Sequence, residues 1–503
     1  MLPCNYNVHM KLIHFFMPKL EYILFLALFW AVAANGPKLL NFDGDLPRHL
    51  LVGQVIRESR SVPTTDIYSF RTEGVAAIPH EWLSQVIFSI SYDLLGLGGV
   101  VVLTALLVTI VWGMVFYESN RRAGSLFISL FITALGIAVS MIHVLPRPHL
   151  FTYLFTALWI VSLERISGDR PQSWWILPLL MLLWVNLHGM FVLGVILWGI
   201  YLVGSFLEHP SRSWFRDPTS RSLILGGLFS IPTTFLSPSG IHIWEAITSL
   251  GSNAYITSRI PEYQSANFHI PETWPFILLL MLTIVGFARN SHKARWTDIL
   301  LTAAFAAIAL YTSRMLPLFA IVAAPIAAKS LAEVVRQEFS NSRFMTTEQN
   351  FTTLNSTSSG AIWLPVLFIV VTIVFRSGSP IDPGNKGNHF DPAFFPVQAV
   401  SWLNANPQEG HMFNEFDWGG YLLLTLSPRQ QIFMDGHTHI YGEALTREYE
   451  TIVTQREGWQ ELLEKYDIQW VIVRESSAIA ESLVEMSWEI LYQDDTSVIL
   501  RKP

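Results

Sequence analysis

Residues 98–117 read GGVVVLTALLVTIVWGMVFY, an uninterrupted run without a charged side chain. A helix of this length rises about 30 Å, which matches the hydrocarbon core of a bilayer. Similar apolar runs recur between Leu20 and Phe375 and are separated by polar loops. Lipid cannot satisfy free backbone polar groups, and the alternating short strands of a membrane barrel are missing from the sequence. The runs therefore predict transmembrane helices.

The same criterion predicts eleven membrane spans. Only 14% of the 503 residues are charged, against about 25% in soluble domains, and the mean hydropathy is +0.38. We therefore expect a polytopic α-helical membrane protein. The spans are placed at 20–36, 98–117, 125–142, 150–165, 174–187, 190–207, 222–237, 275–288, 297–312, 315–332 and 361–375.

The distribution of Lys and Arg predicts the orientation, because cytoplasmic loops collect basic residues. With these spans, five basic loops fall on one side together with Lys11 and Lys19. We expect a cytoplasmic N-terminus whose first span is not cleaved, a flexible cytoplasmic linker at 340–359, and a C-terminal tail outside the plasma membrane. The five loops contain Arg121 and Arg122; Arg165 and Arg170; Arg212, Arg216 and Arg221; Arg289, Lys293 and Arg295; and Lys329, Arg336 and Arg343.

Residues 82–96, WLSQVIFSISYDLLG, are apolar enough to suggest a twelfth span. Counting them as one would place Arg121 and Arg122 outside and invert every later loop. Their apolar side chains gather on one helical face, from Trp82 to Leu94, and the polar ones lie off it. We therefore predict an amphipathic helix in the outer interface of the membrane.

Two units follow from this topology. A transmembrane domain covers 1–376 and includes a long outer loop at 37–97, and an extracytoplasmic domain covers 377–503. In the second unit, apolar runs at 431–434 and 470–473 predict strands, and amphipathic stretches at 443–454 and 458–466 predict helices, which together indicate a small α/β fold. The net charge of −7 does not indicate a nucleic-acid partner, and the single cysteine, Cys4, cannot form an intrachain disulfide.

An acidic motif follows the first span. The segment Asn41–His49 reads NFDGDLPRH. Asp43 and Asp45 could hold Mg²⁺ or Mn²⁺ through oxygen ligands, or one of them could act as a general base on an acceptor hydroxyl. A capped turn explains an isolated Asp-Gly-Asp equally well. Arg48 and His49 complete the segment as candidate substrate-binding residues.

His80 and Glu81 precede the interfacial helix and form a pair capable of acid–base chemistry. Glu81 is a further candidate catalytic residue, and His80 is a candidate binding residue. The alternative is that Glu81 stabilises the helix N-terminus through its dipole, with Trp82 as an interfacial anchor.

Polar residues gather at the outer ends of several spans. Arg147 and Arg314 could grip a phosphate or pyrophosphate through their planar guanidinium groups. Snorkelling to lipid headgroups is the alternative for each of them. His149, Asn186 and His188 lie on the same side and are further candidates for donor binding. The outer loop 238–274 is long enough to cover a site.

The C-terminal unit contains two motifs in which acids adjoin glycines and aromatic residues. The first surrounds Asp417 and Trp418 in NEFDWGGY, and the second surrounds Asp435 and His437 in MDGHTHIYG. Such groups are suited to binding sugars or peptides. The alternatives are a helix N-cap at Asp417 and a strand-end turn at Asp435.

This layout resembles the GT-C superfamily of membrane glycosyltransferases, whose members carry an acidic motif in the first outer loop. The tail distantly resembles the oligosaccharyltransferase catalytic subunit. Residues 415–419 (EFDWG) keep the Asp and Gly of that family's Trp-Trp-Asp-Tyr-Gly motif and lack its Trp pair, which puts recognition of the same acceptor in doubt. The segments at 147–149, 186–189 and 313–317 resemble a bacterial subgroup of these enzymes.

The resemblance implies an inverting glycosyltransferase that uses a polyprenyl-phosphate or polyprenyl-pyrophosphate sugar and an acceptor glycan, lipid or protein, with Asp43 as the leading catalytic residue. A divalent metal is required by some members only. The alternatives are a non-catalytic flippase or exporter and an assembly protein for lipid-linked glycans. The enzyme hypothesis requires that Asp43, Asp45, Arg147, His188 and Arg314 meet at one cavity beneath the C-terminal domain.

Overall fold

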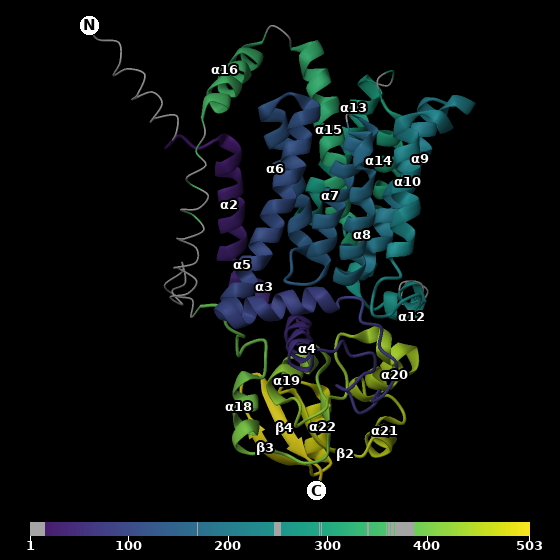
Figure 1. Cartoon of the computed structure of the whole chain (residues 1–503). Coiled ribbons are helices and arrows are strands. Elements are labelled where there is room, and N and C mark those ends of the chain that lie inside the picture. Colours follow the sequence, from purple (N-terminus) through teal and green to yellow (C-terminus); the bar gives the residue numbers. More distant parts are fainter. Residues whose placement is uncertain are drawn as a thin grey trace.

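The structure is a computed structural model that describes residues 16–168, 170–245, 253–290, 292, 294–339, 342–358, 360, 363, 367 and 387–503. A bundle of helices stands on a smaller domain built from the C-terminal part of the chain (Figure 1). The loop that follows the first helix lies between them.

The first ten predicted spans each fall on a helix, and six helical segments are long and apolar enough to cross a membrane. The span predicted at 361–375 lies almost entirely outside the described residues. A multi-pass helical fold is therefore confirmed, and the number of eleven spans stays a prediction. The helices are α2 (Leu20–Ala34), α5 (Trp82–Ala123), α6 (Leu126–Ser140), α7 (His149–Ser167), α8 (Ile176–Leu187), α9 (Val192–Glu208), α10 (Pro218–Thr233), α13 (Trp274–Arg289), α14 (Trp296–Tyr311) and α15 (Leu316–Glu338).

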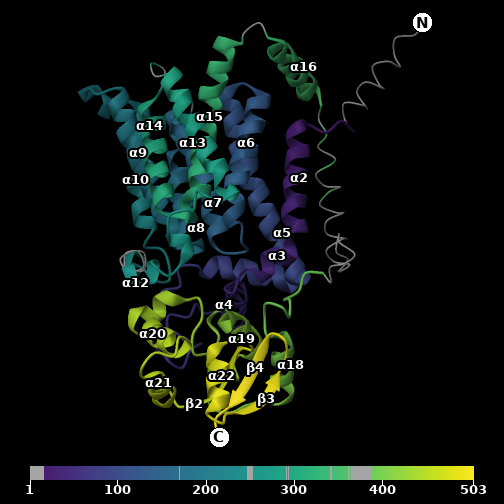
Figure 2. The same ribbon diagram turned by 180° about the vertical axis from the view of Figure 1, so that it is seen from behind.

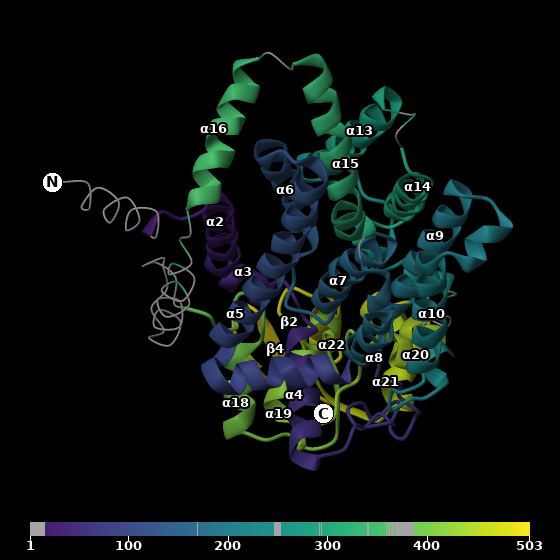
Figure 3. The same ribbon diagram turned by 45° about the horizontal axis from the view of Figure 1, so that its top comes forward.

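Helix α15 forms the core of the bundle and packs against α5, α6 and α13 (Figure 3). Its middle is rich in alanine, and Ala323, Ala324 and Ala327 are completely buried. Small side chains let helix backbones approach closely, which is how helices associate in lipid. Gly286 of α13 meets α15 in this way, because a Cβ at Gly286 would lie 2.5 Å from the Cβ of Ser330.

Helix α5 bends sharply at Gly96, where φ is +62°. Its first part lies across the end of the bundle, and its second part runs through it (Figure 1). The polar Ser84 and Gln85 are buried on the side of α4 (Leu46–Ser59), whereas Leu94 is 74% exposed. A polar face turned inward and an apolar face turned outward suit a helix that lies on lipid, as the sequence predicted for 82–96.

The C-terminal domain contains a four-stranded sheet in the order β1-β2-β4-β3. β1 (His411–Asn414) pairs parallel to β2 (Ile468–Arg474), while β3 (Glu489–Gln493) and β4 (Ser497–Arg501) complete the sheet as antiparallel strands. The helices of the domain are α18 (Val397–Ala405), α19 (Gly419–Leu426), α20 (Thr438–Val453), α21 (Trp459–Lys465) and α22 (Ala478–Glu485).

Two sequence predictions need correction. Residues 431–434 do not form a strand of this sheet; Ile432 instead makes an isolated bridge to Ser69 of the first loop. The predicted flexible linker at 340–359 contains a helix, α16 (Arg343–Thr357), whose Phe351 packs against Phe127 of α6. Neither contact is visible from composition, because each depends on a partner far away in the sequence.

The first loop belongs structurally to the C-terminal domain. Leu51 and Ile56 of α4, together with Tyr68, share a hydrophobic core with Trp418 and Trp470 of that domain. The backbone of Ile432 donates a hydrogen bond to the carbonyl of Tyr68 at 3.0 Å. The segment that carries the acidic motif is therefore fixed by the C-terminal domain.

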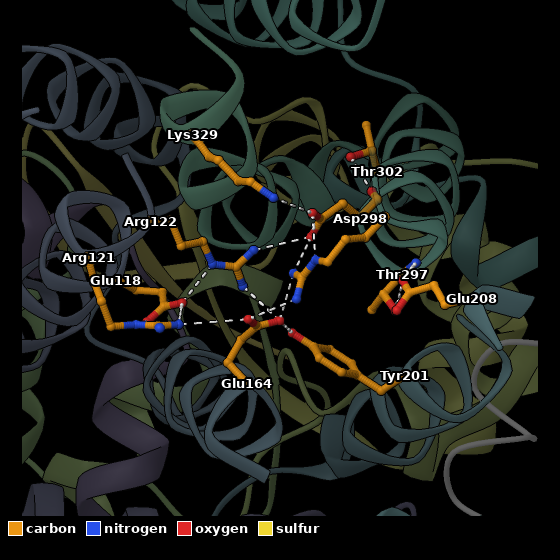
Figure 4. Close-up of polar contacts among 11 residues, drawn as sticks. Glu118, Arg121, Arg122, Glu164, Tyr201, Glu208, Thr297, Asp298, Thr302 and Lys329 are labelled. Carbon is orange, nitrogen blue, oxygen red and sulfur yellow. Dashed lines mark hydrogen bonds and ion pairs between the residues drawn. The ribbon is translucent and has the colours of Figure 1, made fainter. Parts of the chain in front are cut away.

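Basic residues of three of the five loops, Arg121 and Arg122, Arg295, and Lys329, meet at the opposite end of the bundle in a buried ionic network (Figure 4). Arg122 lies at its centre, with ion pairs to Glu118 at 2.6 Å, Glu164 at 3.0 Å and Asp298 at 3.2 Å. Its side chain is only 6% exposed. Further contacts to these carboxylates come from Arg121, Arg295, Lys329 and Tyr201.

Replacing Arg122 with Ala should lower the free energy of unfolding by about 3–5 kcal/mol, because three buried carboxylates lose a common partner. The control is Arg289→Ala, which removes an exposed ion pair with Glu338 and should cost less than about 1 kcal/mol. Thermal unfolding in detergent measures both variants. Equal losses would show that the buried network adds no more than a surface pair.

Candidate functional site

A cavity of about 130 Å³ lies at the junction between the bundle and the C-terminal domain. Four parts of the chain supply its walls: the first loop, the ends of the bundle helices, the loop before α13, and the segment that leads into α20. Most of the residues that line it are polar or charged. The residues are Asp45, Arg48, His49, His80, Glu81, His143, Arg147, Pro148, His149, His188, Ile260, Glu262, Tyr263, Arg314, Gly436, His437, Thr438 and His439.

The acidic motif is joined to Arg147 at one wall of this cavity. Arg147 places Nε and Nη2 at 2.8 and 2.7 Å from Oδ1 of Asp43, and Nη1 at 3.1 Å from Oδ2 of Asp45. Asp43 is fully buried, whereas the Asp45 side chain is 28% exposed and reaches the cavity. The structure thus separates two residues that the sequence could not distinguish, because only Asp45 of the two lines the cavity.

The acidic motif does not fit the divalent metal that the sequence allowed at Asp43 and Asp45. Two of the four carboxylate oxygens, Oδ1 of Asp43 and Oδ2 of Asp45, are already paired with Arg147, and Oδ1 of Asp43 also accepts the Asp45 N–H at 2.9 Å. Oδ2 of Asp43 is buried and accepts no hydrogen bond from the described residues. A cation at this place would stand beside a guanidinium group and be repelled by it. Among the described residues, no cluster of three His, Cys, Asp or Glu side chains could hold a metal ion.

Glycines of the two C-terminal motifs cradle the acidic motif. A Cβ at Gly420 would lie 2.5 Å from the carbonyl oxygen of Gly44, and a Cβ at Gly44 would lie 2.6 Å from the carbonyl oxygen of Asp417. A Cβ at Gly436 would lie only 1.8 Å from Oδ1 of Asp45. The backbone of the C-terminal domain therefore fits directly against the loop, and any side chain at these positions would push it away.

A buried ion pair between Arg48 and Asp435 fastens this contact. The second Nη of Arg48 lies 3.1 Å from Nδ1 of His437 and 3.8 Å from the Asp66 carboxylate. Burial raises the pKa of Asp435 against the opposing charge of Arg48. Arg48 and Asp435 were predicted to bind substrate, but the structure pairs them with each other. Part of the Arg48 side chain also lines the cavity.

Glu81 lies among histidines at another wall. Nε2 of His188 and Nε2 of His80 lie 3.4 and 3.6 Å from its carboxylate, and Nδ1 of His49 lies 3.9 Å away. Burial opposes ionisation of Glu81, but these histidines outweigh it and lower its pKa to about 2. Nδ1 of His188 is in turn hydrogen bonded to Thr152 at 2.7 Å. Glu81 is therefore an ionised carboxylate that faces the cavity.

Arg314 is the arginine of the cavity with the weakest carboxylate contact. Its nearest acidic oxygen, on Glu262, is 3.9 Å away, and its guanidinium stacks 4.7 Å from the ring centre of Tyr263. The loop that bears these partners also contacts the C-terminal domain, where Tyr255 of α12 (Ala254–Thr257) donates to Glu450 of α20 at 2.6 Å (Figure 2). The outer loop thus closes one side of the cavity, as its length suggested.

Five predicted site residues do not line the cavity: Asp43 and Asp435, whose ion pairs lie behind its walls, and Asn186, Asp417 and Trp418. Asn186 holds the indole N–H of Trp82 at 2.8 Å and so fixes the start of α5. Trp418 is buried in the domain core, and the exposed carboxylate of Asp417 pairs with Arg474 at 3.3 Å. Motif resemblance drew attention to Asp417 and Trp418, but their side chains point away from the cavity walls.

Four residues that line the cavity were not predicted as site residues from the sequence: His143, Glu262, Tyr263 and His439. His143 lies six positions before His149 in the same outer turn, and His439 lies two after His437. Glu262 and Tyr263 lie in the outer loop 238–274, whose many polar residues could not be ranked as site residues from the sequence. Their selection depends on how that loop folds over Arg314, which spacing does not reveal.

This fold defines a class of protein. No protein-family model matches the chain, and no curated protein matches it. Solved structures of an archaeal oligosaccharyltransferase share its fold, so the fold predicted by resemblance is confirmed.

The neighbours include the archaeal oligosaccharyltransferase AglB from Archaeoglobus fulgidus in complex with an inhibitory peptide and a dolichol-phosphate. It is 10% identical, with a TM-score of 0.57 over 90% of this chain and 69% of that chain. The same enzyme tethered to an acceptor peptide with the NVT sequon gives 12% identity and a TM-score of 0.53 over the same shares. ArnT from Cupriavidus metallidurans, bound to undecaprenyl phosphate, gives 13% and 0.47 over 95% of this chain and 97% of that chain. At these identities the likeness establishes the fold.

Gly420→Ala should destabilise the protein by about 1–3 kcal/mol, because the added methyl group overpacks the contact with Gly44. Gly199→Ala is the matched control, since a Cβ at Gly199 in α9 would meet no atom within 4 Å. In a helix this change should be neutral or stabilising by up to about 1 kcal/mol. Thermal unfolding compares the two, and equal midpoints would argue against a close cradle.

Acidification should also destabilise the protein through His188. Burial lowers the pKa of His188 to about 3, although Glu81 opposes this shift. The unfolded chain, with a histidine pKa of about 6.5, takes up the proton first, so stability is lost as the pH falls below that value. His188→Gln should weaken this pH dependence by about 2 kcal/mol at pH 5, and the exposed His269→Gln should not. Unfolding midpoints between pH 7 and 5 measure the difference.

Proposed function

We propose that the protein is a glycosyltransferase that moves a sugar from a polyprenyl-phosphate or polyprenyl-pyrophosphate donor to an acceptor at the outer face of the membrane. The observation that carries this proposal is the cavity at the junction. Asp45, Arg147, His188 and Arg314 line it, and the buried Asp43 stands directly behind Arg147. These are the residues whose convergence the enzyme hypothesis required.

The position of the cavity suits a lipid-linked substrate. It lies beside the interfacial part of α5, where a polyprenyl chain could remain in lipid while its phosphate enters the polar walls. Arg314 is the best candidate for the phosphate, because its guanidinium has no short pair with a carboxylate. Fold neighbours bound to dolichol-phosphate or to undecaprenyl phosphate give this donor class support by analogy only.

The reaction can be written with the residues at hand. The acceptor hydroxyl or amide attacks the anomeric carbon, and the bond from this carbon to the phosphate oxygen breaks with inversion. Arg314 stabilises the charge that develops on the leaving phosphate. Asp45 orients the acceptor and accepts its proton, and the ionised Glu81 on the facing wall is the alternative base.

Orientation follows from charge. The basic loops gather at the end of the bundle remote from the cavity, so the positive-inside rule assigns the cavity and the C-terminal domain to the outer face. A flippase would be expected to carry polar groups deep along its spans, whereas the polar groups of the cavity lie at the helix ends.

The test uses purified full-length protein in liposomes with a polyprenyl-phosphate sugar and a panel of acceptors. Asp45→Asn should reduce transfer at least a hundredfold, because the acceptor loses its base. The matched control, Asp495→Asn, changes an exposed aspartate in the turn before β4 and should retain full transfer. Unchanged transfer in Asp45→Asn would overturn the assigned role. Movement of the donor across the bilayer without release of phosphate would favour the flippase.

A further inference from the structure

The acidic motif has an internal cation. The guanidinium of Arg147 touches both carboxylates of the motif with three nitrogens, at 2.7–3.1 Å. Two of these nitrogens contact Oδ1 of Asp43, and the third contacts Oδ2 of Asp45. One planar guanidinium therefore bridges the two carboxylates. A cation that joins two carboxylates across a turn is the arrangement that oxygen-rich metal sites create with a divalent ion.

Arg147 is also fixed independently of these acids. Its backbone N–H donates to the carbonyl of Leu145 at 2.8 Å, in the tight turn that leads to Pro148 and α7. The side chain is 25% exposed, and its three-nitrogen grip leaves little freedom to rotate toward a ligand. Burial would favour a neutral guanidinium, but Asp43 and Asp45 hold the pKa of Arg147 above its ordinary value. The positive charge is therefore permanent.

The local net charge decides whether Arg147 binds the donor phosphate or holds the acidic motif together. Bridging two carboxylates leaves a net charge of −1 on the group of three, which would repel rather than attract a donor phosphate. Arg314, by contrast, has a single carboxylate partner, Glu262 at 3.9 Å, and no short ion pair. Arg147 thus acts on the acidic motif, and Arg314 is left for the phosphate.

We infer that Arg147 takes the place of a divalent metal ion at the acidic motif, so that sugar transfer by this protein needs no added metal. The guanidinium holds Asp43 and Asp45 together and supplies the positive charge between them. This inference deepens the proposed function and rests on it for the statement about transfer. The statement about the acidic motif itself can be tested without any reaction.

The experiment measures binding of Mn²⁺ to the detergent-purified full chain by electron paramagnetic resonance. Wild type should bind no Mn²⁺ at this motif at millimolar concentrations, because Arg147 fills it. Arg147→Ala removes the guanidinium and leaves two adjacent carboxylates, so it should gain a site at least tenfold tighter than any in wild type. The gain should vanish in the double variant Asp43→Asn with Arg147→Ala, which assigns the site.

Two controls separate this role from a general change of charge or fold. Arg314→Ala removes an equal charge from the same cavity without touching Asp43 or Asp45, and it should gain no Mn²⁺ site. Arg147→Lys keeps a charge at the motif and should also gain none. A Mn²⁺ site in Arg314→Ala, or none in a folded Arg147→Ala, would overturn the inference.

A second measurement covers transfer. Wild type should keep its rate in excess EDTA, within a factor of two of the rate with Mg²⁺ or Mn²⁺, and Arg147→Ala should lose at least a hundredfold. A tenfold or larger loss of wild-type transfer in EDTA would refute the internal cation while leaving the glycosyltransferase intact. Absence of transfer under every condition would instead count against the proposed function, and the Mn²⁺ result would stand by itself.

Discussion

The buried ion pair between Arg48 and Asp435 joins residues 387 positions apart, and the architecture of the cavity depends on it. Arg48 follows the acidic motif by three residues, and Asp435 precedes Gly436, which abuts Asp45. An ion pair excluded from water holds its partners in one geometry, because separation leaves a charge without compensation. The pair therefore sets the distance between the two walls of the cavity, and the glycine contacts exclude a looser fit.

Some charged groups at the cavity are fixed in ion pairs, whereas others are accessible from its interior. Asp43 and Arg147 are paired with each other, whereas Asp45 and Glu81 present carboxylate oxygens to the interior. Arg314 rests on an aromatic ring rather than on a short ion pair. Asp43 and Arg147 therefore shape the cavity, and Asp45, Glu81 and Arg314 are the groups that a ligand would meet. Charged groups that are already held in position need little reorganisation energy when a ligand binds.

Helix positions and the interfacial segment were predictable because they follow from local hydrophobicity, which is independent of distant partners. Basic loops such as those around Arg122 and Arg295 were correctly grouped by the same reasoning. The roles of Asp417 and Trp418 were not predictable, since motif similarity does not fix the direction of a side chain. Pairing of Arg48 with Asp435 and the helix at 343–357 likewise depend on contacts that only the folded chain creates.

The shared core between the first loop and the C-terminal domain has a consequence for biosynthesis. Leu51 and Ile56 are synthesised before Trp470, their partner in the core, which follows far later in the sequence. Domains fold as units once their residues are available, and the N-terminal parts are made first. The early segment therefore keeps apolar residues uncovered until the strand that contains Trp470 has been made. A product that terminates before this strand contains the acidic motif but cannot form the core that positions it.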